Sequence, residues 1–256
     1  MKTANIIGVI LLLNAGGLIA QDIEKKMQHS ISFKPSFVQI KDQFNYGLVN
    51  NGLDLAGEYA MTLSRERYTL AYKAELGLGA NYKQGLGLAW SFKPLDVYYG
   101  FRLNNHPRAP LTLGPYAAGY YMWQLYPELQ SGKMFWLSSY EVGPRFQISL
   151  PLKGRFLHLT VSSSLASLNS RPELRTEEYY YSLTFADLVR KPHSNMTFVF
   201  LDVFNHTQFI LELTDPNKKF SMAYEFNYIG YLNAPGFKYM AHSIFLKWKI
   251  RTKNLK

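Results

Sequence analysis

The sequence contains no cysteine, which excludes disulfide bonds and a lipid-modified N-terminal cysteine. Beyond residue 20 it also lacks any apolar run approaching the ~20 residues that a membrane-spanning helix needs. If the chain crosses a membrane after this point, it has to do so as a closed β-barrel, in which neighbouring strands pair each other's backbone groups. No linker rich in Gly, Ser or Pro divides the chain, so we expect a single domain.

The N-terminus has the pattern of a secretory signal peptide. Met1 and Lys2 are followed by an apolar run from Ile6 to Leu13 and by small residues up to Ala20. We expect cleavage after Ala20, with residues 1–20 as the signal peptide and residues 21–256 as the mature domain. The alternative, an uncleaved membrane anchor, is disfavoured because the apolar core is shorter than a spanning helix.

Large apolar residues alternate with small or polar ones along most of the mature chain. The alternation is clearest from Tyr68 to Gly79 and from Phe220 to Tyr228. Side chains of a strand point alternately to its two faces, so each of these strands has one apolar and one polar face. Aromatic residues make up 16% of the chain, and charged residues recur on the polar face. These features favour a transmembrane barrel, apolar toward lipid and polar toward its lumen, over a soluble sandwich.

The pattern predicts an all-β fold: a single closed antiparallel transmembrane β-barrel of about twelve strands, in a range of about 10–14. About thirteen segments qualify as strands, and single-chain bacterial barrels use even numbers, so one of them is wrong. The weakest is 179–188, because residues 185–190 also fit a short helix or folded loop. Lys93–Pro94 is expected to turn the chain and to separate two strands, since proline is excluded from a paired central strand.

With these features the chain resembles the outer-membrane β-barrel proteins of Gram-negative bacteria. The resemblance is carried by the signal peptide, the strand-and-turn repeat and the last strand, which sets Ile244, Leu246, Trp248 and Ile250 against Ser243, Phe245, Lys247 and Lys249. It implies a location in the outer membrane after export and signal-peptide cleavage. The basic tail from Arg251 to Lys256 departs from the family, in which the last strand usually ends the chain. The function stays open, because such barrels act as pores, enzymes, adhesins and scaffolds.

Charged residues on the polar face are the candidate functional residues. They describe either a conduit lined with both signs or a narrow barrel whose interior is filled by ion pairs. We expect paired charges such as Lys73 with Glu75 and Arg145 with Glu141 to neutralise one another or neighbours across the barrel. The function expected is non-enzymatic: a narrow, porin-like channel or a membrane component of an envelope assembly. The residues expected to line the lumen are Asp54, Glu58, Lys73, Glu75, Arg102, Glu141, Arg145, Glu225 and Lys247.

A hydrolase of outer-leaflet lipid, similar to the phospholipase A or lipid A deacylase families, is the alternative function. Those families place a His and a Ser two residues apart on the lipid-facing side of one strand. Here His242 and Ser243 are adjacent, so a strand would send them to opposite faces. The catalytic alternative therefore rests on His193 and Ser194, which follow Pro192 in an expected loop where strand alternation does not apply.

The net charge of +10 suggests anionic partners. For an exported protein these are outer-membrane lipid and the phosphates of lipopolysaccharide, not nucleic acid. An envelope protein is the further partner expected if the barrel is part of an assembly. No cofactor is expected and no metal site, since the six histidines show no spacing that pairs two of them.

Overall fold

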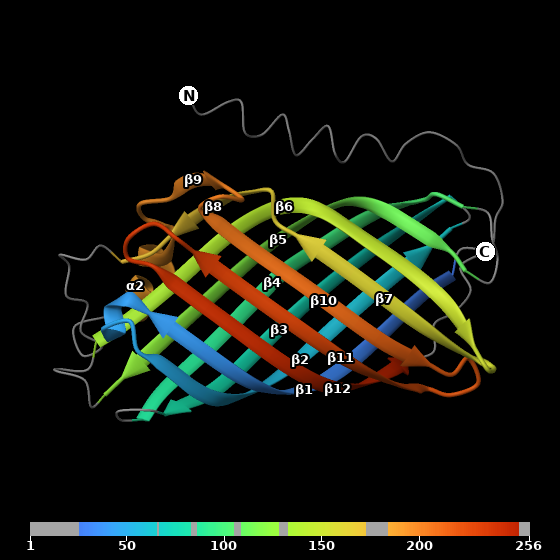
Figure 1. Ribbon diagram of the computed structural model, residues 1–256, viewed down its shortest axis with the longest axis horizontal. Coiled ribbons are helices and arrows are strands. Elements are labelled where there is room, and N and C mark those ends of the chain that lie inside the picture. The colour runs from blue at the N-terminus through green and yellow to red at the C-terminus, as the bar shows by residue number, and fades with distance from the viewer. Residues whose placement is uncertain are drawn as a thin grey trace.

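The computed structural model describes residues 26–65, 67–82, 86–104, 109–127, 133–172 and 184–250. The expected signal peptide and the basic tail lie outside these residues. The described part is almost entirely antiparallel β-sheet (Figure 1). Its strands are β1 (Lys26–Asp42), β2 (Val49–Ser64), β3 (Tyr68–Tyr82), β4 (Leu86–Arg102), β5 (Leu111–Tyr126), β6 (Lys133–Leu152), β7 (Arg155–Ser163), β8 (Ala166–Ser170), β9 (Thr197–Phe200), β10 (Phe204–Thr214), β11 (Phe220–Tyr231) and β12 (Phe237–Ile250).

The sheet closes into a barrel of ten strands. Neighbours pair in the order β5-β4-β3-β2-β1-β12-β11-β10-β7-β6, and pairing of β5 with β6 completes the ring. The remaining two strands lie outside the ring. β8 pairs with the first half of β6, and β9 pairs with β8. The expected all-β closed antiparallel barrel is thus confirmed. The sheet has twelve strands, but the ring has ten, which is below the estimate of about twelve and within the expected range of 10–14.

The turn expected at Lys93–Pro94 was wrong. β4 runs straight through this pair, and its pairing with β5 shifts register between Phe92 and Leu95. Such a shift is a β-bulge, and a bulge tolerates proline because the extra residue needs no backbone N–H in the ladder. Two expected strands are therefore one strand of 17 residues.

The weakest of the expected strands was 179–188; its first part, 179–183, lies outside the described residues, and 185–188 are helical. α2 (Phe185–Arg190) begins after Thr184, whose hydroxyl accepts from the Asp187 backbone N–H while the Asp187 carboxylate accepts from Thr184 in return. This reciprocal capping box favours helix over strand here, and the hydrogen bonds from Thr184 hold the pKa of Asp187 below its usual range. A short 3-10 turn, η3 (Lys191–His193), follows directly, and another, η1 (Gln43–Asn45), links β1 to β2.

The barrel has two different ends. The end that carries α2, β8, β9 and the β11–β12 turn is called the helix end, and lies at the left of Figure 1. The opposite turn end carries the start of β1, the end of β12 and the β6–β7 and β10–β11 turns. Among the described residues, no helix has the length and apolar character needed to cross a membrane.

The barrel wall is apolar outside. Exposed side chains include Phe33, Leu76, Leu78 and Leu246, each more than half exposed. Aromatic pairs flank this band on both sides. Trp90 stacks on Trp123 toward the helix end, with ring centroids 6.0 Å apart, and Phe220 lies 4.8 Å from Trp248 at the turn end.

Candidate functional site

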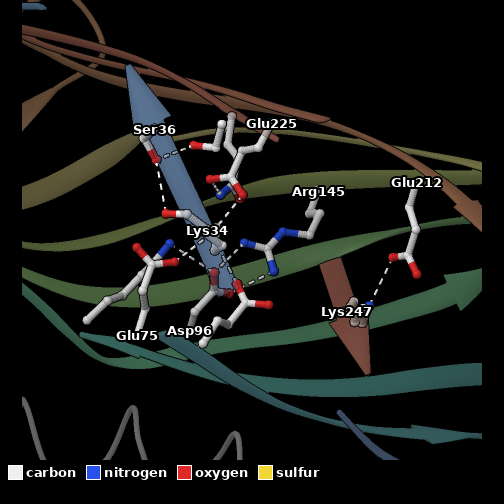
Figure 2. Close-up of polar contacts among 12 residues, drawn as sticks. Lys34, Ser36, Glu75, Asp96, Arg145, Glu212, Glu225 and Lys247 are labelled. Carbon is white, nitrogen blue, oxygen red and sulfur yellow. Dashed lines mark hydrogen bonds and ion pairs between the residues drawn. The ribbon is translucent and has the colours of Figure 1, made fainter. Parts of the chain in front are cut away.

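The interior of the barrel is built around a buried lysine. Lys34 of β1 places its Nζ 2.6 Å from Glu75 Oε2, 2.8 Å from Glu225 Oε2 and 3.3 Å from Glu58 Oε2. These carboxylates come from β3, β11 and β2, so one cation ties four strands together (Figure 2). We call these four residues the Lys34 cluster.

A second ion group lies beside it, as Figure 2 shows for Asp96 and Arg145. Arg145 of β6 donates from both terminal nitrogens to Asp96 of β4, at 2.7 and 3.0 Å, and Lys93 Nζ lies 3.1 Å from the same carboxylate. The guanidinium also lies over the ring of Tyr116, 4.6 Å from its centroid. Bidentate pairing and ring stacking both use the planar fork that distinguishes arginine from lysine.

A chain of hydrogen bonds links side chains of β5, β6, β10 and β11. Glu141 accepts from the hydroxyl of Tyr116 at 3.2 Å and lies 2.7 Å from His206 Nδ1. The other ring nitrogen of His206 lies 2.9 Å from Asn227 Oδ1. Together with the two ion groups, this chain places polar contacts on eight of the ten strands of the ring.

The order of residues along β1 shows how the interior is layered. Lys34 is followed on the same inward face by Val38 and Ile40, both with no exposed area, and then by Asp42. Val38 and Ile40 belong to an apolar layer between the Lys34 cluster and the helix end, to which Val199 of β9 contributes from outside the ring. Its buried members are Val38, Ile40, Tyr120, Met122, Leu137, Val199, Phe204, Ile229, Tyr231, Phe237, Tyr239 and Ala241.

Little space is left between these layers. A cavity of about 20 Å³ lies where the Lys34 cluster meets Tyr239 and Ala241 of the apolar layer. That is about the volume that one water molecule occupies. At this level the lumen is packed and not open.

Each end of the barrel has its own polar group. Toward the turn end, Lys247 Nζ donates to Glu212 Oε2 at 2.9 Å. At the helix end, Arg171 donates to both oxygens of Asp42, each at 2.8 Å, and lies over the rings of Phe44 and Phe237.

The residues expected to line the lumen are distributed through these groups. Asp54 accepts from the Tyr239 hydroxyl at 3.4 Å beside the small cavity, and Arg102 is half-buried at the turn end. Lys73 is half-buried opposite Asp96 in the β3–β4 register. The others lie in groups already described: Glu58, Glu75 and Glu225 in the Lys34 cluster, Arg145 on Asp96, Glu141 on His206, and Lys247 on Glu212.

Of the two arrangements expected for these charges, pairing along one strand was wrong, and pairing with groups on other strands is found. Glu75 pairs with Lys34, and Arg145 pairs with Asp96. Lys73 and Glu75 are two rises of about 3.4 Å apart along β3, and Glu141 and Arg145 are four rises apart along β6. Directly opposed residues on neighbouring strands have Cβ atoms only about 4.5–5.5 Å apart. Cross-strand partners, and partners across a narrow lumen, are therefore the nearer ones.

Several central residues were not among the candidates from sequence. Lys34 is one of them, although Ser30, Ser32 and Ser36 share its face of β1 and are buried. That run of small polar residues, alternating with Ile31 and Phe33, was the signal available. Lys93 was hidden by the expected turn, and Asp42, Arg171, His206 and Glu212 gave no pattern by spacing alone.

The catalytic alternative places His193 and Ser194 on the outer surface at the helix end. His193 Nδ1 lies 3.1 Å from the Tyr140 hydroxyl, and its ring packs edge-on against Tyr121. The Ser194 hydroxyl instead donates to the Lys191 carbonyl oxygen at 2.7 Å. The two side chains thus have separate partners. Within the described ranges, no group of three or more His, Asp or Glu is arranged to hold a metal ion.

Comparison with known proteins supports the architecture. No protein-family model and no curated protein matches the sequence. Among solved structures, the outer membrane protease OmpT from Escherichia coli aligns over 91% of this chain and 99% of its own, with TM-score 0.53 and 8% identity. The translocator domain of autotransporter NalP from Neisseria meningitidis aligns over 96% and 95%, with TM-score 0.41 and 10% identity. At these identities the likeness concerns the fold. The chain has the fold of the β-barrel proteins of the Gram-negative outer membrane.

Proposed function

We propose that this protein is an integral barrel of the outer membrane with a closed interior, and that it serves as a non-enzymatic membrane component of an envelope assembly. The observation that carries the proposal is the packed lumen, in which the Lys34 cluster and the apolar layer lie in series. A narrow channel would need a water path past both. Small barrels fill their interiors with side chains in this way.

The exterior supports the membrane location. The exposed apolar band between two groups of aromatic pairs matches the surface that an outer-membrane barrel presents to lipid and to its two interfaces. Outer-membrane barrels keep short turns on the periplasmic side and longer connections outside, which assigns the helix end to the cell surface. Strands of 15 to 20 residues exceed the 9–11 that span a bilayer, so part of the barrel projects from it. Outer-membrane lipid, lipopolysaccharide and an envelope protein are the partners that this placement implies.

Conductance tests the closed interior. We expect the purified protein in planar bilayers to produce no steady open-channel current, while a known porin in the same bilayers conducts. The physical reason is that an ion would have to cross a layer of twelve buried apolar residues. Large, steady currents from the wild-type protein would overturn the proposal.

Lipid turnover tests the hydrolase, which the outer position of His193 keeps as the second candidate. We expect no release of fatty acid from phospholipid or lipid A. His242 offers a matched control, because it also lies on the outer surface beside a tyrosine, 2.8 Å from the Tyr224 hydroxyl. Turnover that is lost in His193→Ala and kept in His242→Ala would establish the enzyme and reject the non-enzymatic function.

A further inference from the structure

The helix end contains a cavity that the closed lumen does not account for. Its volume is about 260 Å³, and it lies between β8, β9 and the β11–β12 turn. Asn169, Thr197 and Tyr231 line it from the three strands, and Pro235 from the turn. Figure 1 shows β8 and β9 at this end of the barrel. The volume is just below the ~300–1,000 Å³ of sites for drug-sized ligands, so a smaller molecule fits it.

Two residues that line this cavity each have a buried polar atom without a partner in the part of the chain that the structure describes. Asn169 is 1% exposed; its Nδ2 donates to Ser167 Oγ at 2.8 Å, while its Oδ1 has no hydrogen bond. Arg171 is 7% exposed, and its Nη atoms donate to Asp42 and to the Pro235 carbonyl oxygen, but its Nε has no acceptor. Buried polar groups are normally paired, so an acceptor and a donor that stay unpaired beside a cavity point to a ligand.

The charge of the cavity limits the kind of ligand. Of its eight described lining residues, only Arg171 is charged, and Asp42 neutralises it at 2.8 Å. An anionic or cationic ligand would therefore lose its hydration without gaining an unpaired counter-charge. Thr197 adds a hydroxyl to the lining, and Tyr231 and Pro235 add apolar surface.

We propose that this cavity binds a neutral sugar unit. A sugar carries hydroxyl groups that both donate and accept, which suits Asn169 Oδ1 and Arg171 Nε, and C–H faces that pack against a tyrosine ring. The site lies at the end assigned to the cell surface, and only that orientation rests on the proposed function. A free sugar and a sugar of lipopolysaccharide share this chemistry.

Ligand-observed NMR titration of the folded, detergent-solubilised protein tests the proposal. The probes are glucose and galactose, with glucuronate and glucosamine as charged analogues. We expect the neutral sugars to bind and the charged ones to bind more weakly. Oligosaccharide released from lipopolysaccharide is a further probe: tighter binding than the free sugars supports a lipid-linked source, and equal or weaker binding supports a free one. Absence of binding by every probe would overturn the site.

Variants locate the binding. Asn169→Leu removes the amide at nearly constant volume, and Ala234→Trp fills the cavity from its rim, so each should weaken binding by about tenfold or more. Asn233→Leu is the matched control. It makes the same substitution as Asn169→Leu and lies in the same turn as Ala234, but Asn233 does not line the cavity, so this variant should bind as the wild type does. Equal binding by all three variants would place the sugar elsewhere and reject the proposal. NMR titration measures sugar binding independently of conductance. Open-channel currents would therefore reject the closed lumen of the proposed function without affecting the test of the sugar site.

Discussion

Lys34 holds one positive charge between carboxylates from three other strands, with only 2% of its surface exposed. A buried ion pair is weak evidence for stability in itself, because desolvation offsets much of the attraction. Removal of one partner is different, since it leaves the remaining charges buried and unpaired. The main effect of Lys34 is therefore to neutralise the buried carboxylates around it, and the net attraction within the cluster matters less.

We accordingly expect Lys34→Met to destabilise the barrel by about 3–5 kcal/mol, the usual effect of breaking a buried pair. Denaturant unfolding in detergent micelles measures the change. Lys41→Met is the matched control, because it makes the same substitution on the exposed face of the same strand and should change stability by less than about 0.5 kcal/mol.

A compensating variant separates charge from packing. We expect part of the lost stability to be restored when Lys34→Met is combined with Glu58→Gln, Glu75→Gln and Glu225→Gln, because these changes remove the unpaired charges. If Lys34→Met unfolds at the same denaturant concentration as Lys41→Met, the Lys34 cluster does not have this role.

At the scale of a single strand, β3 presents two faces with opposite requirements. Leu76 is 59% exposed and lies between the two aromatic groups of the outer wall, whereas the neighbouring Glu75 points to Lys34 in the lumen. A charge on the outer face meets lipid, and the cost depends on depth.

Leu76→Arg should therefore destabilise the barrel by about 2–4 kcal/mol if it lies near the bilayer midplane. Tyr82→Arg should cost at most about 1 kcal/mol, because Tyr82 ends the same strand at the helix end and is 69% exposed. Unfolding of both variants from phospholipid vesicles provides the comparison. Equal stabilities would contradict the placement of the apolar band in the membrane.

At the scale of the whole molecule, ring closure removes the free edges that an open sheet of this size would have. We expect the protein to stay in the pellet when membranes are washed with carbonate or urea, because the apolar wall has no favourable place in water. We also expect its gel mobility to change on boiling, as a closed barrel unfolds. Release of folded protein by the wash would reject the outer-membrane location.

Alternation along each strand determines the class of this fold, and it can be seen in the sequence alone. The step from Phe220 to Met222 to Tyr224 stays on one face whatever surrounds the strand, because side-chain direction has a period of two. The same local logic made residues 185–190 a helix candidate. It failed at Pro94, because tolerance of a proline depends on whether the neighbouring strand accommodates a bulge.

The number of strands in the ring and the partners of each charge were decided only by the tertiary structure. β8 and β9 lie outside the ring because the first half of β6 pairs with β8 and only its second half pairs with β7. Lys34 meets Glu225, 191 positions later in the numbering, because closure brings β1 beside β12 and its neighbour β11. The sugar cavity likewise combines residues from β8, β9 and β11. Local pattern specifies which face a side chain occupies, whereas closure of the ring specifies what it meets there.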